Sequence, residues 1–131
     1  MEITHVAGPT AKIGLVDDDA SIRKSVVRLL RAHGYACKAY DSAEMALADP
    51  ELLRMDCLLI DIQLEGISGI ELRDRVLAQR IHMPHIFISA CAAPDWRVCL
   101  QQMGNSPCLG KPFEEWELIA LLDVLLQTNA G

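Results

Sequence analysis

The chain has 131 residues, and its 18 acidic and 12 basic side chains give a formal net charge of −6. This length fits one domain, and the hydrophobic content of 51% is enough to build a core without metal or disulfide staples. The acidic balance, with no cluster of Lys and Arg, argues against direct nucleic-acid binding by this domain.

Short apolar runs alternate with helical patterns along the chain. Five runs predict strands, at residues 13–16, 35–39, 57–60, 86–89 and 108–109. The intervening patterns predict five helices: residues 20–33, a short helix from Ser42 that ends at Pro50, residues 68–80, a weaker one from Pro94 to Gly104, and one after Phe113. Such alternation is typical of right-handed βαβ units, so we expect an α/β fold whose parallel sheet is covered on both faces.

Two helix starts carry an acceptor followed three residues later by Glu, which resembles a capping box. These are Asp41 with Glu44, and Ser68 with Glu71. The predicted boundaries place an N-terminal tail at residues 1–11, the domain at 12–127, and a C-terminal tail or linker start at 128–131.

Polar residues stand where the expected strands end. The first strand ends in Asp17, Asp18 and Asp19, the third in Asp61, the fourth in Ser89, and the fifth shortly before Lys111. Ligands of open parallel sheets bind at the carboxyl ends of the strands. We therefore expect these groups to face one crevice.

Clustered carboxylates repel one another and need a cation to stay ionised together. Hard oxygen ligands suit Mg²⁺, and a carboxylate can itself accept a phosphoryl group while a metal, a Lys and a hydroxyl balance the charge. Asp19 is better explained as a helix cap, since Asp favours that position.

The ordered set of motifs resembles the receiver domain of two-component response regulators over nearly the whole chain. The matching segments are residues 13–19, 56–61 and 64–69, Ser89-Ala90, and Lys111-Pro112-Phe113. The resemblance implies a flavodoxin-like three-layer sandwich with the strand order 2-1-3-4-5. It also implies a phosphoacceptor signalling domain rather than a classical enzyme, phosphorylated by a sensor histidine kinase.

The resemblance also assigns roles to individual residues. Asp61 would accept the phosphoryl group, and Asp18 and Asp61 would bind Mg²⁺ with Asp17 in support and the backbone carbonyl of Gln63 as a further ligand. Ser89 would be the switch hydroxyl, and Lys111 would pair with the phosphoryl group. The family usually has a cis peptide before the equivalent of Pro112, a bond that is essentially a proline feature.

Two positions depart from the family pattern. Glu65 stands where many receivers have proline, which adds a negative charge near the site. Cys108 stands where receivers usually carry Tyr or Phe, the side chain that links phosphorylation to the surface made by the fourth helix, the fifth strand and the last helix. That surface is the expected site of partner or homodimer contacts. Cysteine is too small to replace the aromatic side chain, so we expect the coupling between phosphorylation and that surface to differ from the usual one.

Two alternatives therefore stay open. One is a haloacid-dehalogenase-like phosphatase with Asp17 as nucleophile. Asp17, Asp19, Ser89 and Lys111 follow one another in the order in which that superfamily carries its site residues. The chain lacks a late acidic pair, since Asp123 lies within the amphipathic last helix. The other is a receiver-like interaction module that does not switch.

The remaining features predict location and packing. Five cysteines without a Cys-x-x-Cys pair are typical of reduced thiols in the core. Nearby acids would raise the pKa of Cys91, which argues against redox sensing by this thiol. The N-terminus lacks a signal-peptide pattern and no run approaches the ~18 apolar residues of a membrane span, which predicts a cytoplasmic protein. Trp96 and Trp116 are expected to pack or to face a partner.

Overall fold

The computed structural model describes residues 10–90, 104 and 106–130, with the side chains of 128–130 left out. Its five strands are β1 (Lys12–Val16), β2 (Ala36–Tyr40), β3 (Cys57–Asp61), β4 (His85–Ser89) and β5 (Cys108–Gly110). They form one parallel sheet in the order β2-β1-β3-β4-β5. This is the expected α/β fold and the expected strand order.

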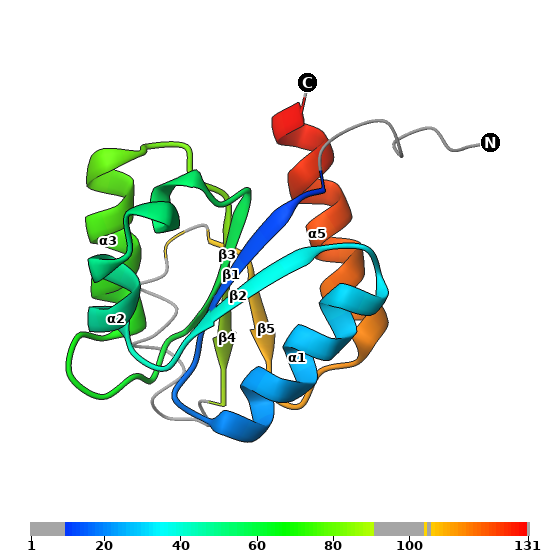
Figure 1. Cartoon of the computed structure of the whole chain (residues 1–131), viewed down its shortest axis with the longest axis horizontal. Coiled ribbons are helices and arrows are strands. Elements are labelled where there is room, and N and C mark those ends of the chain that lie inside the picture. The colour runs from blue at the N-terminus through cyan, green and yellow to red at the C-terminus, as the bar shows by residue number, and fades with distance from the viewer. Residues whose placement is uncertain (1–9, 91–103, 105, 131) are drawn as a thin grey trace.

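Helices cover both faces of this sheet (Figure 1). α1 (Ala20–Ala32) and α5 (Glu115–Ala130) pack on one face, and α2 (Ala43–Ala48), the 3-10 helix η2 (Pro50–Arg54) and α3 (Gly69–Gln79) pack on the other. The helix expected between Pro94 and Gly104 lies mostly outside the described residues, as do Cys91, Trp96 and Cys99. None of the described helices is long and apolar enough to cross a membrane.

β3 is the central strand, and all five of its residues are buried. Side chains alternate across a strand, so Leu58 and Ile60 enter the core under α2 and α3 while Cys57 and Leu59 enter the core under α1 and α5. An almost wholly apolar strand is what burial on both faces requires. Asp61, at its end, is the charged exception.

Three local features differ from the sequence prediction. The short second helix ends at Ala48, and Pro50 begins η2 instead of closing a helix, because proline is well suited to the first turn. The α2 cap is Ser42, whose hydroxyl accepts from the Met45 amide, and the Glu44 carboxylate does not close a capping box there. α5 continues to Ala130, beyond the end expected for the domain at residue 127.

Candidate functional site

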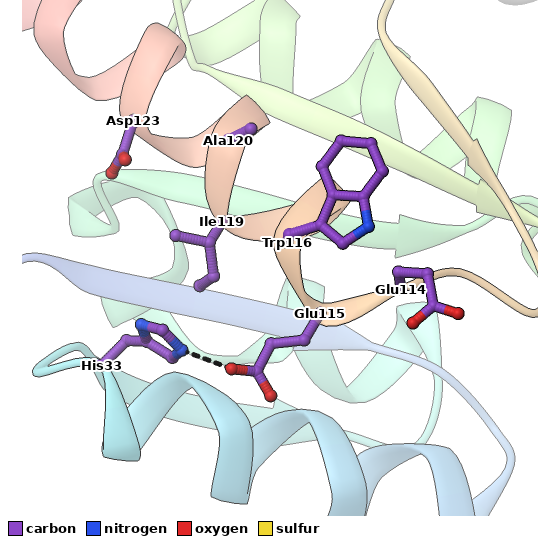
Figure 2. A pocket seen from close by; sticks show the side chains of 7 residues that line it. All are labelled: His33, Glu114, Glu115, Trp116, Ile119, Ala120 and Asp123. Carbon is purple, nitrogen blue, oxygen red and sulfur yellow. Dashed lines mark hydrogen bonds and ion pairs between the residues drawn. The ribbon is translucent and has the colours of Figure 1, made fainter.

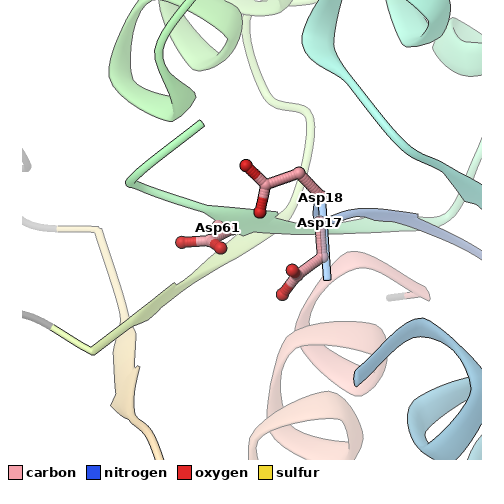
Figure 3. A group of neighbouring side chains, drawn as sticks. All are labelled: Asp17, Asp18 and Asp61. Carbon is pink, nitrogen blue, oxygen red and sulfur yellow. The ribbon is translucent and has the colours of Figure 1, made fainter. Parts of the chain in front are cut away.

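The carboxyl ends of β1 and β3 bring three acidic side chains together. Carboxylate oxygens of Asp17, Asp18 and Asp61 all lie within 4.8 Å of one another (Figure 3). Asp17 is fully buried and Asp61 is 5% exposed, whereas Asp18 is exposed to solvent. The acidic cluster expected from the strand order is therefore present, with its acids graded from the interior to the surface.

Local hydrogen bonds hold the two buried carboxylates in place. Asp17 Oδ1 accepts from the Asp19 amide at 2.9 Å, and Asp61 Oδ1 accepts from the Gln63 amide at 3.0 Å. In each carboxylate the second oxygen, Oδ2, is left to point toward the centre of the site, where both Oδ2 atoms contact the ammonium of Lys111. Asp19 is the N-cap of α1, as expected, since its carboxylate accepts from the amides of the first turn.

Lys111 supplies the positive charge. Its Nζ lies 2.9 Å from Asp17 Oδ2 and 3.2 Å from Asp61 Oδ2, and its side chain is 17% exposed. The Lys111–Pro112 peptide bond is cis, as the resemblance implied. One ammonium between two buried carboxylates, with a third carboxylate beside them, leaves the cluster with a negative excess.

The electrostatics follow from this arrangement. Burial raises the pKa of Asp61, and the nearby Asp17 adds to that rise, while the Gln63 amide and Lys111 oppose it. Burial alone would lower the pKa of Lys111, but its bonds to Asp17 and Asp61 raise it overall. The ammonium is therefore firmly charged, and the carboxylates still favour a further cation.

The donor set suits a hard divalent cation. The three acids offer carboxylate oxygens in reach of one another, and the cluster includes no thiolate or imidazole. The residues present therefore fit Mg²⁺, which prefers one or two carboxylates and keeps several waters.

Ser89 is buried at the end of β4. It pairs with Gly110 in the sheet register, and its carbonyl accepts from the Lys111 amide at 2.7 Å. β4 and β5 thus bring the hydroxyl and the ammonium to the same edge of the sheet as the carboxylates. Every residue that the sequence proposed for the site lies at this edge.

The loop after Asp61 is held by contacts that the sequence analysis did not identify. The Gly69 amide donates to the Ile62 carbonyl at 3.1 Å, and the Ile67 amide donates to Glu44 Oε2 at 3.0 Å. A Cβ at Gly69 would overlap the Asp61 carbonyl, so the start of α3 can approach the site this closely only with glycine. The Ser68-Gly69 start of α3 was visible in the sequence, but the partner of Glu44 was not.

The other candidate acid lies elsewhere. Asp123 is exposed on α5, and its Oδ1 accepts from the Tyr35 hydroxyl at 3.2 Å. It does not join the carboxylate cluster, so the second acidic pair that a haloacid-dehalogenase-like phosphatase would need is not found among the described residues. The structure thus weakens that alternative.

Comparison with known proteins gives a consistent result. The family model of the response regulator receiver domain matches residues 13–123. Nodulation protein W of Bradyrhizobium diazoefficiens is 32% identical over 113 residues, and the match covers 86% of this chain and 50% of that protein. The transcriptional regulatory protein FixJ of the same organism is 31% identical, with 85% of this chain and 54% of that protein covered.

Solved structures agree. The chemotaxis protein CheY4 of Vibrio cholerae superposes with a TM-score of 0.79 at 27% identity, covering 90% of this chain and all of that one. The chain spans about half the length of the first curated relatives that it matches. The family model covers most of the chain, and the fold and the acidic cluster agree with it, so the chain belongs to the receiver domains of two-component response regulators.

Proposed function

We propose that Asp61 accepts a phosphoryl group from a sensor histidine kinase in a Mg²⁺-dependent reaction. The observation that carries the proposal is the shared ammonium: Lys111 Nζ contacts Asp17 Oδ2 and Asp61 Oδ2 at 2.9 and 3.2 Å. This geometry collects a nucleophilic carboxylate and a cation at the end of the central strand.

The chemistry of the step follows from the positions of these groups. An Asp61 oxygen attacks phosphorus, the bond between phosphorus and the imidazole nitrogen of the donor breaks, and the imidazole leaves with the electron pair and is then protonated. Mg²⁺, when held by Asp17, Asp18, Asp61 and the Gln63 carbonyl, would neutralise charge on the phosphoryl oxygens. Lys111 Nζ pairs with another of these oxygens, and the Ser89 hydroxyl is the expected third contact.

Among the three acids, Asp61 suits the role of nucleophile. It ends β3, it is slightly exposed where Asp17 is fully buried, and its Oδ1 is oriented by the Gln63 amide. Asp17 and Asp18 precede the cap of α1 and are better placed to bind the metal. The domain would thus catalyse only its own phosphorylation and dephosphorylation.

The test is phosphorylation by acetyl phosphate in the presence of Mg²⁺, followed by intact mass measurement. We expect one phosphoryl group on the wild type and none on Asp61→Asn. Asp56→Asn is the matched control, because Asp56 stands just before β3 at the opposite edge of the sheet. A folded wild-type protein that stays unmodified would overturn the proposal, and label retained in Asp61→Asn would overturn the residue assignment.

The response to phosphorylation is the finer part of the proposal. An aspartyl phosphate adds negative charge beside Ser89 and Lys111, whose β4 and β5 backbones are joined by a hydrogen bond. We expect this change to alter partner or homodimer contacts near β5 and α5. Cys108 is half-buried and packs against the core beneath α2 and α3. Because a cysteine stands at this position, the aromatic side chain that is usual in the family cannot mediate the change.

Two measurements separate a switch from the non-switching module. Sedimentation measures the association state, and amide chemical shifts in β5 and α5 measure local change, each with and without the phosphoryl group. Changes in either support the switch. Stable phosphorylation of Asp61 with no change in either measurement would favour the non-switching module.

A further inference from the structure

The loop between β3 and α3 is tied to a helix that contributes nothing else to the site. Glu44 lies in the first turn of α2, and its Oε2 accepts from the Ile67 amide across 23 positions of sequence at 3.0 Å. This bond to the amide is the main reason why the pKa of Glu44 is lowered. A carboxylate that stays ionised makes a stronger acceptor for an amide than a neutral group does.

The loop backbone is shaped to receive this carboxylate. Gly66 has φ +76°, a conformation that side chains other than glycine rarely adopt, and a Cβ at this position would overlap Glu44 Oε2. The turn at Gly66 therefore opens the space in which the carboxylate sits. The adjacent Glu65 is exposed, and it stands where a proline would stiffen the loop.

The other described hydrogen bonds of the loop lie near its two ends, while Leu64 and Ile67 pack against the core beneath α2 and α3. The Gln63 amide donates to Asp61 Oδ1, and the Gly69 amide donates to the Ile62 carbonyl. The Glu44 bond fixes the far half of the loop, next to the α3 cap Ser68. Movement of that half would be transmitted to Gln63, whose amide orients the Asp61 carboxylate.

We infer that Glu44 is a positioning residue for the metal-binding loop: its carboxylate holds the Ile67 amide and thereby fixes Gln63 and Asp61 in the geometry that Mg²⁺ requires. This inference rests on the proposed function, because the loop is assigned to metal binding there. Glu44 itself contacts no residue of the acidic cluster in the described contacts. Its effect is therefore indirect, through the loop backbone.

The experiment compares Glu44→Ala with Glu44→Gln. Alanine removes the acceptor, whereas glutamine keeps a carbonyl oxygen that can accept from the same amide. We expect Glu44→Ala to speed amide hydrogen exchange at Ile67 in the metal-free protein and to raise the Kd for Mg²⁺ about threefold to tenfold. Glu44→Gln should bring both quantities back to within about twofold of the wild type.

Glu51→Ala is the matched control, because Glu51 is an exposed acid on the neighbouring η2 that faces Lys38 rather than the loop. It should change neither quantity. A second route breaks the same contact: Gly66→Ala should weaken Mg²⁺ binding, and its effect should be smaller in the Glu44→Ala background, where the overlap is removed.

The outcomes distinguish this inference from the proposed function. Unchanged Ile67 exchange in Glu44→Ala, or faster exchange with unchanged Mg²⁺ affinity, would overturn the inference. A wild-type protein that binds Mg²⁺ but takes no phosphoryl group, with weaker binding in Glu44→Ala, would overturn the proposed function and leave the inference standing.

Discussion

Both edges of the sheet carry polar side chains that contact the backbone, but like charges gather at the carboxyl-terminal edge. At the amino-terminal edge, Arg80 Nη1 donates to the carbonyls of Leu53 and Met55, at 3.0 and 2.6 Å. There, His85 lies between the Met83 carbonyl and the Ser106 hydroxyl. Each of these polar groups is paired within the protein, so this edge is built for stability.

The carboxyl-terminal edge is built differently. Three carboxylates gather beside one ammonium, which contacts Asp17 and Asp61, and burial raises the pKa of Asp61. Like charges this close cost stability, and proteins retain such costs mainly where function needs them. Chemistry is therefore expected at the edge of the sheet where like charges gather.

The strongest way to test this contrast is to remove the ammonium. Lys111→Met should slow phosphorylation by acetyl phosphate about hundredfold or more, because it removes a positioned charge from the reacting phosphoryl group. Mg²⁺ should bind more tightly, since a cation that competes for the same carboxylates is gone.

Phosphorylation rates and Mg²⁺ titrations check both expectations. Lys38→Met is the control, because Lys38 pairs with Asp49 on the surface. A near-normal phosphorylation rate in Lys111→Met would contradict the role given to Lys111.

Breaking the other edge should have the opposite profile. Arg80→Met leaves the carbonyls of Leu53 and Met55 without their donor, and we expect the free energy of unfolding to fall by about 2 kcal/mol. Denaturant unfolding measures this loss, and the Kd for Mg²⁺ should stay within about twofold of the wild type. A large change in Mg²⁺ affinity in a folded variant would show that the two edges are coupled.

A smaller effect should come from relieving the charge cluster at its exposed member. Asp18→Asn removes one negative charge without breaking a described hydrogen bond, so the metal-free protein should become more stable by about 0.5 kcal/mol. The same substitution should raise the Kd for Mg²⁺ about tenfold. Asp41→Asn, another exposed acid, is the control, and destabilisation by Asp18→Asn would contradict repulsion as the dominant effect.

The smallest effect is the pH dependence of the amino-terminal edge. Burial lowers the pKa of His85 below the ordinary imidazole value of 6.5. The folded state therefore prefers the neutral imidazole, and the stability that this provides is present above pH 6.5 and is lost as the pH falls through the lower folded-state pKa. Imidazole NMR titration checks the direction, and a His85 that titrates above 6.5 would refute it.

Much of the fold follows from local patterns. The apolar β3 and the periodic helices predict a doubly covered parallel sheet, and that topology alone brings Asp17, Asp61 and Lys111 to one edge. These residues are predictable because each stands immediately after, or close to, a strand end. The sheet does the rest of the positioning.

What the sequence did not reveal are single long-range hydrogen bonds. The Glu44 carboxylate of α2 reaches a backbone amide in the loop before α3, and Arg80 reaches the carbonyls of Leu53 and Met55. Backbone amides and carbonyls are present at nearly every residue, so such a contact leaves no periodicity or motif in the sequence. Because its long-range partner leaves no pattern, the sequence indicated only a capping role for Glu44.

The surface of α5 around Trp116 shows which of the two roles expected for this residue holds. Trp116 is 69% exposed on α5, so it faces outward instead of filling the core. It borders a pocket with His33 and Glu115, which are joined by a 2.7 Å contact, and with Ile119 (Figure 2). Of the two roles expected for this tryptophan, the structure excludes core packing.

The hydrogen bond from the Lys111 amide to the Ser89 carbonyl has a mechanical consequence. At 2.7 Å it joins the ends of β4 and β5, so the backbones that carry the hydroxyl and the ammonium cannot shift independently without breaking it. A displacement of the end of β4 is therefore passed to β5, and a displacement of β5 is passed to β4. The phosphoryl group would therefore pull on one joined unit rather than on two separate side chains.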